Sequence, residues 1–206
     1  MSAVATAPLP VSSPQSQPDP GPLRWKWTRE DFVRLYELGF FNGQRVMLID
    51  GEVLAMSPMN PEHANGIIFT LQVLQAAFGS NFTIRPQLPL DLGQTTDPEP
   101  DIAIVSGSAR SHPNTPTTAE LVVEVADSSL SFDLNDKANL YAAAAIREYW
   151  VLDVVNRQLH IFRDPRRDAS QRFGHKYYHH QTFAPSDQVT LLAAPSSSIL
   201  VSDLLP

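Results

Sequence analysis

One acidic residue stands inside the most apolar segment of this chain. Residues 121–125 read Leu-Val-Val-Glu-Val, so only Glu124 interrupts a continuous run of branched hydrophobic side chains. Such a run is typical of a central strand that is covered on both faces of its sheet. A carboxylate in that position is costly unless another group pairs with it. The segment therefore predicts a layered fold around a sheet and a polar partner for Glu124.

The rest of the sequence predicts more strands and only a few helices. Asp50-Gly51 separates two apolar stretches within residues 45–56, which favours a hairpin with a type I′ turn. Further strands are expected near residues 82–86, 102–105, 149–155, 158–163, 176–183 and 189–192, with a short strand and turn in 198–206. The sum predicts a mixed sheet with few helices, which is an α+β fold or an α/β fold with a small core.

Three helices are expected from capping signals and apolar spacing. The first spans residues 28–39, and the second is capped by Asn60 and ends before Gly79. The third is expected over residues 134–145, with Asp133 near its start. The buried stripe of the second helix is expected to hold Ala64, Ile67, Ile68, Leu71, Leu74 and Phe78.

Composition excludes several function classes. The 206 residues hold 15 Lys and Arg against 22 Asp and Glu, a formal net charge of −7. This charge disfavours a protein whose whole surface coats nucleic acid or an anionic membrane. The absence of Cys excludes disulfides, thiolate nucleophiles and Cys-based zinc sites. No apolar run approaches the length of a membrane span, and we expect a cytoplasmic protein.

Proline is concentrated at the start of the chain. Residues 1–22 contain six of the 18 prolines, with one charged residue and no long apolar stretch. Such a segment buries too little apolar surface to offset its ordering entropy, and it does not resemble a secretory signal. We therefore expect a disordered tail at residues 1–22 and a single domain at residues 23–206.

Three more polar residues are surrounded by apolar sequence, as Glu124 is. Glu52 follows the hairpin turn, Asp101 leads into an apolar strand, and Lys137 lies on the inner stripe of the third helix. We expect all four side chains to point inward. Carboxylates are ligands for Mg²⁺ or Mn²⁺, and a nearby ammonium can orient a water or stabilise a phosphoryl transition state. Together the four residues predict hydrolysis of a phosphodiester without a Ser or Cys nucleophile.

Each residue also has a structural interpretation. Glu52 would be a partly solvated acid beside a turn, and Asp101 a strand-start acid satisfied by backbone N–H groups. Glu124 and Lys137 would form a buried salt bridge without a catalytic role.

Two further side chains are accessory candidates. His63, in the first turn of the second helix, contacts either the scissile phosphate or a metal-bound water, or it is a hydrogen-bonded packing residue. Tyr141, one turn after Lys137, hydrogen-bonds the site or packs in the core.

At these residues the sequence resembles the Uma2 family of endonucleases, within the PD-(D/E)XK, restriction-endonuclease-like superfamily. The resemblance covers the chain from about Trp27 to the C-terminus. The matching segments are Leu-Ile-Asp-Gly-Glu at 48–52, Met-Ser-Pro at 56–58, His63, Glu-Pro-Asp-Ile-Ala-Ile-Val at 99–105, Leu-Val-Val-Glu-Val at 121–125, Asp-Lys at 136–137 with Tyr141, and Glu-Tyr-Trp-Val-Leu-Asp at 148–153.

The resemblance implies a restriction-endonuclease-like core, a central mixed sheet flanked by helices. It also implies that Asp101 and Glu124 hold the divalent metal, with Glu52 as a supporting acid. Ala126 stands where the simplest superfamily pattern has Lys, so Lys137 takes that role from the following helix. A second departure is Ala145, which stands where the family has Gly. A homodimer is expected, because related nucleases often cut one strand per subunit.

A basic cluster offers a surface for the expected partner, a nucleic acid and specifically DNA. Arg157, Arg163, Arg166, Arg167, Arg172 and Lys176 lie within 20 residues, against Asp164 and Asp168. Phosphates favour such a patch, and we expect Arg163, Arg166 and Arg167 to bind the substrate. The alternative is an ordinary solvated hairpin loop.

Two other functions compete with a Mg²⁺-dependent DNA endonuclease. One is a catalytically inactive binding or scaffold module that keeps the nuclease fold, which the displaced lysine and the acidic composition favour. The other is a histidine-based metal hydrolase, in which His160 meets His179 or His180 across strands.

Overall fold

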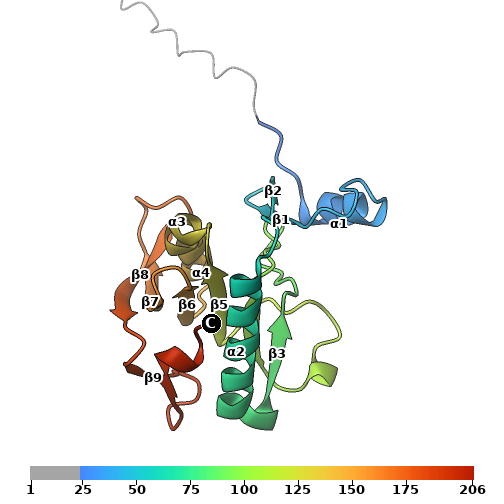
Figure 1. The fold of residues 1–206 in the computed structure, drawn as a ribbon. Helices are drawn as coiled ribbons and strands as arrows, with labels where there is room; N and C mark the ends of the chain where they lie inside the picture. Colours follow the sequence, from blue (N-terminus) through green and yellow to red (C-terminus); the bar gives the residue numbers. More distant parts are fainter. Residues whose placement is uncertain (1–23) are drawn as a thin grey trace, which may run out of the picture.

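A computed structural model describes residues 24–206, so the tail expected at residues 1–22 lies outside the described residues. In chain order the elements are α1 (Arg29–Glu37), β1 (Val46–Ile49), β2 (Glu52–Ala55), α2 (Pro61–Phe78), η1 (Gly79–Asn81), β3 (Phe82–Pro86), β4 (Ile102–Ser106), η2 (Ala109–Ser111), β5 (Leu121–Ala126), α3 (Leu130–Phe132), η3 (Asp133–Lys137), α4 (Ala138–Ala143), β6 (Glu148–Asp153), β7 (Gln158–Arg167), β8 (His175–Phe183), β9 (Gln188–Thr190), β10 (Ser198–Leu200) and η4 (Val201–Asp203) (Figure 1).

A six-stranded mixed sheet organises the chain, in the order β3-β4-β5-β6-β7-β8. All neighbouring strands are antiparallel except β5 and β6, which run parallel and pair Glu124 with Val151. Parallel neighbours need a crossover connection, and the helical run from α3 to α4 provides it. The expected α+β fold with a mixed sheet is confirmed.

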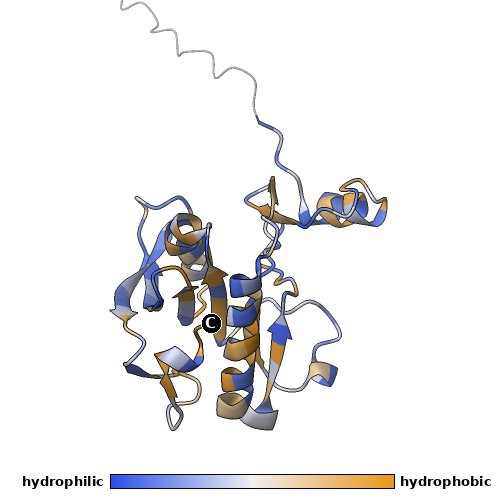
Figure 2. Cartoon of the chain, viewed as in Figure 1, coloured by the Kyte–Doolittle hydropathy of each residue, from blue (hydrophilic) through white to orange (hydrophobic). Residues whose placement is uncertain are grey.

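Helices cover both faces of this sheet. Alternate residues of β4, β5 and β6 join α2 in one core cluster, and the residues between them join α4 in a second cluster. Every residue of β5 is buried, as the apolar run predicted, and Figure 2 shows this strand beside α2 in hydrophobic colours. A Cβ on Gly66 of α2 would lie 2.9 Å from Val125 Cγ1, so this glycine lets α2 approach β5 closely.

The strands β1 and β2 form a separate antiparallel hairpin. Asp50 and Gly51 both have positive φ angles, 50° and 76°, as a type I′ turn requires, so the predicted turn is confirmed. An antiparallel bridge between Leu48 and Asp97 attaches the hairpin to the loop that precedes β4. The hairpin therefore stands beside the strand ends of β4 and β5 rather than within the main sheet.

Two expectations for the helices are wrong in detail. The third helical run begins at Leu130, one turn earlier than predicted. The Ser129 carbonyl accepts from Phe132 N and Asp133 N, so Asp133 lies inside the run rather than at its start. The middle of the run is a π-helical turn, η3, which buries both Asp133 and Lys137. Ile68 is 47% exposed, because it lies about 100° around α2 from the buried Ile67.

Between residues 24 and 206, no helix combines the length and the apolar character that crossing a membrane requires.

The end of α4 carries local strain at the position where the resemblance implies glycine. Ile146 N donates to Tyr141 O and Ala145 N donates to Ala142 O, which is the hydrogen-bond pattern of a Schellman motif. Ala145 adopts a φ of 56° there, in the left-handed region that costs a residue with a Cβ about 1–2 kcal/mol.

We predict that Ala145→Gly stabilises the protein by up to about 1 kcal/mol, because glycine adopts this conformation without a Cβ clash. Urea unfolding measures the change. Ala143→Gly, two residues earlier in the helix, is the matched control and should destabilise by about 1 kcal/mol. Equal effects of the two substitutions would contradict the prediction.

Candidate active site

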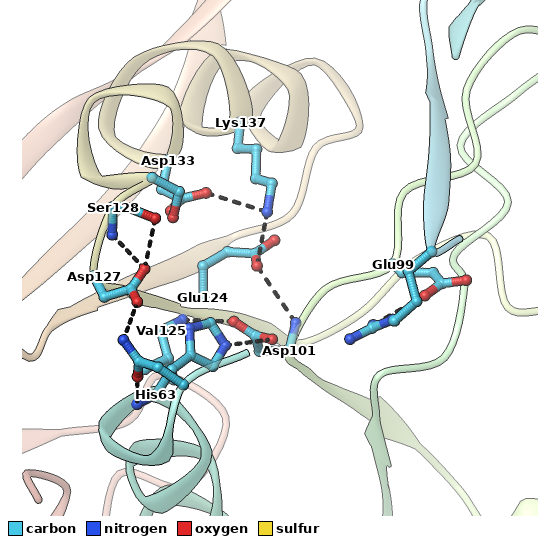
Figure 3. A network of polar contacts seen from close by, with 12 residues as sticks. His63, Glu99, Asp101, Glu124, Val125, Asp127, Ser128, Asp133 and Lys137 are labelled. Atoms are coloured by element: carbon cyan, nitrogen blue, oxygen red, sulfur yellow. Dashed lines mark hydrogen bonds and ion pairs between the residues drawn. The ribbon is translucent and has the colours of Figure 1, made fainter. Parts of the chain in front are cut away.

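Asp101 and Glu124 face each other on neighbouring strands. Asp101 immediately precedes β4, and the β4–β5 register pairs Ile102 with Val123, which sets Asp101 opposite Glu124. Asp101 N donates to Glu124 Oε2 at 3.4 Å, and Val125 N donates to Asp101 Oδ2 at 2.8 Å. Both carboxylates are buried, and Figure 3 shows the contact between Asp101 and Glu124. Sheet pairing thus joins two acids that lie 23 residues apart in the sequence.

Lys137 completes the charged cluster from the crossover helix. Its Nζ lies 2.9 Å from Glu124 Oε2 and 3.1 Å from Asp133 Oδ1. The Tyr141 hydroxyl donates to the other oxygen of Glu124, Oε1, at 2.7 Å. The spacing of four residues among Asp133, Lys137 and Tyr141 aligns them on the helix face that packs over β5. Lys137 and Tyr141 therefore both reach Glu124, as their shared stripe predicted.

His63 enters the cluster from the first turn of α2. Its Nε2 lies 3.2 Å from Asp101 Oδ1. Asn60 fixes this end of the helix, because its side chain accepts from His63 N at 2.9 Å and donates to Asp127 Oδ2 at 2.6 Å. Asp127 directly follows β5, so the cap ties the start of α2 to the strand that carries Glu124.

Burial and charge shift the pKa values of these groups in different directions. Burial raises the pKa of Glu124 to about 7, and the charges of Asp101 and Asp133 reinforce the rise, while Lys137 opposes it. Burial lowers the pKa of Lys137, but attraction to Glu124 and Asp133 outweighs burial, so the pKa is raised overall and the ammonium keeps its proton.

The His63–Asp101 pair shows the same competition. Burial raises the pKa of Asp101, but the hydrogen bond and charge of His63 lower the pKa by a larger amount. The pKa of Asp101 therefore falls overall. Burial lowers the pKa of His63, but the hydrogen bond and charge of Asp101 outweigh it and raise the pKa overall. The pair therefore favours an ionised Asp101 beside a protonated His63.

These side chains line a cavity of about 330 Å³ between the hairpin, the start of α2 and the crossover helix. One part of its wall is charged or polar, with Asp101, Glu124, Asp133, Lys137 and His63. Another part is apolar and comes from the hairpin, the loop after it and α3. Arg45 also lines the cavity and pairs with Glu99 at 3.1 Å.

The expectation that Glu52 points inward with the other acids is wrong. Its side chain is 44% exposed, lies 3.2 Å from Arg172 Nη2, and does not line the cavity. The reason lies in the hairpin. The tight turn pairs Glu52 with Ile49 at the tip, where the β7–β8 loop supplies Arg172. The metal set of Asp101, Glu124 and Glu52 is therefore not assembled.

The structure also fixes the partners of the three predicted substrate-binding arginines. Arg163 neutralises the buried Glu148 and donates to Thr190 O, so it is held in a structural ion pair. Arg166 pairs with Asp164. Arg167 is exposed and forms no ion pair with the acids of residues 24–206.

Two acids at the site, Asp133 and Asp127, are not among the site residues that the sequence predicted. Asp133 was interpreted only as a helix-start charge, although its spacing of four residues from Lys137 could have indicated a shared face. Asp127 follows β5 directly, and no sequence pattern indicated its contact with Asn60.

His160 and His180 do meet across β7 and β8, with Nδ1 and Nε2 3.2 Å apart. Within the described part of the chain, however, no three His, Cys, Asp or Glu side chains converge well enough to hold a metal ion by themselves. The histidine-based hydrolase thus lacks a three-ligand site there.

A Mg²⁺ ion needs fewer protein ligands than such a cluster. It usually binds through one or two carboxylates and fills its other positions with water and substrate phosphate oxygens. Asp101 and Glu124 provide two carboxylates on the wall of one cavity. The residues present therefore fit a divalent ion that is shared with a substrate.

We predict that Lys137→Met lowers the free energy of unfolding by about 3–5 kcal/mol near neutral pH, because it leaves buried acids without their cation. Because the pKa of Glu124 is about 7, this carboxyl is protonated near pH 5 and needs no counterion there. The loss should therefore be smaller at about pH 5 than at about pH 8.

Denaturant unfolding of wild type and variant at both pH values, with a chelator present, measures the difference. Lys176→Met is the matched control, because it removes a partly exposed lysine paired with Asp168 at 2.8 Å and should have little effect. A loss that is the same at both pH values would contradict the coupling to Glu124.

Comparison with known proteins agrees with this fold. The structure is similar to the crystal structure of a protein from Anabaena variabilis ATCC 29413 that is described as "a putative nuclease belonging to DUF820". The TM-score is 0.64 at 12% sequence identity, and the match covers 86% of this chain and 96% of that one. Comparison with curated proteins gives no match. Residues 29–200 match the family model of Uma2, described as "Putative restriction endonuclease", and the chain therefore belongs to the Uma2 family.

Proposed function

We propose that this protein is a divalent-metal-dependent endonuclease that hydrolyses phosphodiester bonds in DNA. The observation that carries the proposal is the meeting of Asp101, Glu124 and Lys137 at one cavity. Membership of the Uma2 family and the nuclease fold support the general class of activity. The ion, Mg²⁺ or Mn²⁺, and the DNA substrate belong to the proposal.

The two carboxylates would hold the ion. When bound, it would supply positive charge to the phosphoryl oxygens and make a water molecule more acidic. Asp101 is suited to this role because His63 and Val125 N fix its orientation and favour its ionised form. Glu124 is fixed by Lys137 and Tyr141.

Lys137 would act on the substrate directly. An ammonium has three N–H donors, and that of Lys137 forms ion pairs with Glu124 and Asp133. An N–H of this ammonium would donate to a phosphate oxygen or to the attacking water. Because the pKa of Lys137 is raised, the group stays charged across the physiological range.

We predict that Asp101→Asn, Glu124→Gln and Lys137→Met each lower the cleavage rate of DNA in Mg²⁺ or Mn²⁺ by at least about 100-fold, because each removes a charge at the reacting phosphate. Gel analysis of labelled strands measures the rates. Asp203→Asn, an exposed acid in η4, is the control and should cleave like the wild type. Equal cleavage by wild type and all three variants would exclude the assignment.

A second candidate is a catalytically inactive binding module, and one observation favours it. Every carboxylate oxygen of Asp101 and Glu124 already has a polar partner within the protein. A cluster satisfied in this way is stable without an ion, as a purely structural ion-pair network would be.

Calorimetry with Mn²⁺ separates the two candidates. We predict that the folded wild type binds Mn²⁺ at millimolar concentration and that Asp101→Asn does not, because one remaining carboxylate holds the ion too weakly. Asp203→Asn should bind like the wild type. A folded wild type that gives no binding heat at this concentration would support the inactive module.

We further propose that the working form is a homodimer, as the family resemblance implied. Light scattering of the purified protein tests this, and a molar mass of one chain, 22.8 kDa, would contradict it.

A further inference from the structure

The cavity at the acid cluster has an apolar wall that hydrolysis itself does not need. Met47 and Leu54 are direct partners in the β1–β2 hairpin, so they lie on the same face. Met56 follows two residues after Leu54, and Met59 and Phe132 complete the wall from the next loop and from α3. Three thioethers, an alkyl group and an aromatic ring therefore line the same cavity as the carboxylates.

This wall suits a flat, polarisable ligand group. Thioethers adapt to irregular shapes and make favourable contacts with aromatic rings. The Phe132 ring, whose centroid lies 5.9 Å from Lys137 Nζ, adds an aromatic surface beside the charged cluster. The cavity volume of about 330 Å³ is in the range of small-molecule sites. In a nucleic acid, the flat and polarisable group nearest to each phosphate is the base.

Base pairing decides which nucleic acids can use such a wall. In a duplex the bases are stacked and paired inside the helix, so a base reaches a protein cavity only when it is unpaired or flipped out. A single strand presents its bases freely to aromatic and apolar side chains. A duplex would pay the cost of unpairing before it could occupy the cavity.

The charges around the cavity also favour binding through a base. Four acids line the cavity, Asp101, Glu124, Asp127 and Asp133, and they outnumber its three basic groups, which are Lys137, His63 and the partly exposed Arg45, whose charge is shared with Glu99. Phosphate attraction at this surface is therefore limited, and contacts with a base would have to supply much of the affinity.

On the basis of the proposed function, we propose that Met47, Leu54, Met56, Met59 and Phe132 form a subsite for one unstacked nucleobase beside the scissile phosphate. The preferred substrate is then single-stranded or locally unpaired DNA rather than regular duplex. Arg45, on the rim of the same cavity, is placed to contact a neighbouring phosphate.

The test measures binding without cleavage. In the Asp101→Asn protein with Mg²⁺, fluorescence anisotropy compares three labelled probes of equal length: a single strand, the blunt duplex of the same sequence, and a strand of abasic sugar-phosphate units. We expect the single strand to bind at least about 10-fold more tightly than the other two probes, because stacking on an aromatic side chain contributes substantially per base.

Two substitutions in the apolar wall locate the effect. Phe132→Leu keeps an apolar side chain but removes the ring, and Met59→Ala truncates a side chain that is 41% exposed. Each should weaken binding of the normal strand by about 5-fold or more and leave binding of the abasic strand unchanged. Phe40→Ala removes an exposed ring outside the cavity, so it is the control, and thermal unfolding verifies that each variant is folded.

The outcomes separate this inference from the proposed function. Equal affinity for normal and abasic strands, or tighter binding of the duplex, overturns the subsite even if the wild type cleaves DNA. A third outcome is that binding depends on the base and is lost in Phe132→Leu and Met59→Ala, but the wild type does not cleave DNA. This outcome overturns the nuclease proposal and supports the subsite. Absence of binding to all three probes overturns the subsite, and cleavage of DNA by the wild type then decides the nuclease proposal separately.

Discussion

The structure depends on how the Glu124 carboxylate is accommodated inside a fully buried strand. Removing a carboxylate from water carries a large free-energy cost, which raises its pKa and must be offset by partners. Three partners offset it here: the ammonium of Lys137, the hydroxyl of Tyr141 and the backbone N–H of Asp101. Two of them come from the crossover helix and one from the residue before β4, so this one acid ties β5 to the crossover helix and to the start of β4.

The same requirement explains the architecture around the site. Glu124 can meet Lys137 and Tyr141 only because the parallel pair β5–β6 needs a crossover, and that crossover lies on the face toward which Glu124 points. The π-helical turn within the crossover buries both Asp133 and Lys137. On the other side, Gly66 lets α2 approach β5, and the cap at Asn60 holds His63 beside Asp101.

A chemical consequence is that the charged cluster is ordered before any ion or substrate arrives. The carboxylates are held by hydrogen bonds, and the protonation states of Asp101 and Lys137 are set by their neighbours. Preorganised charges of this kind need little rearrangement during a reaction. The same cavity also has an apolar wall, and the proposed substrate would place a phosphate at the charged cluster and a base at this wall.

Local chemistry in the sequence determined the elements and most of the charged cluster. The Asp50-Gly51 turn, the Asn60 cap and the apolar strand around Glu124 were all predicted, because each depends on residues a few positions apart. Asp101, Glu124 and Lys137 stood out because a charge within apolar sequence must be paired. Only the tertiary structure decided which distant charges meet. Glu52 lies 120 residues from Arg172, and Arg163 lies 15 residues from the buried Glu148 that it neutralises. Such pairings follow from how strands and loops pack, and no local pattern encodes them.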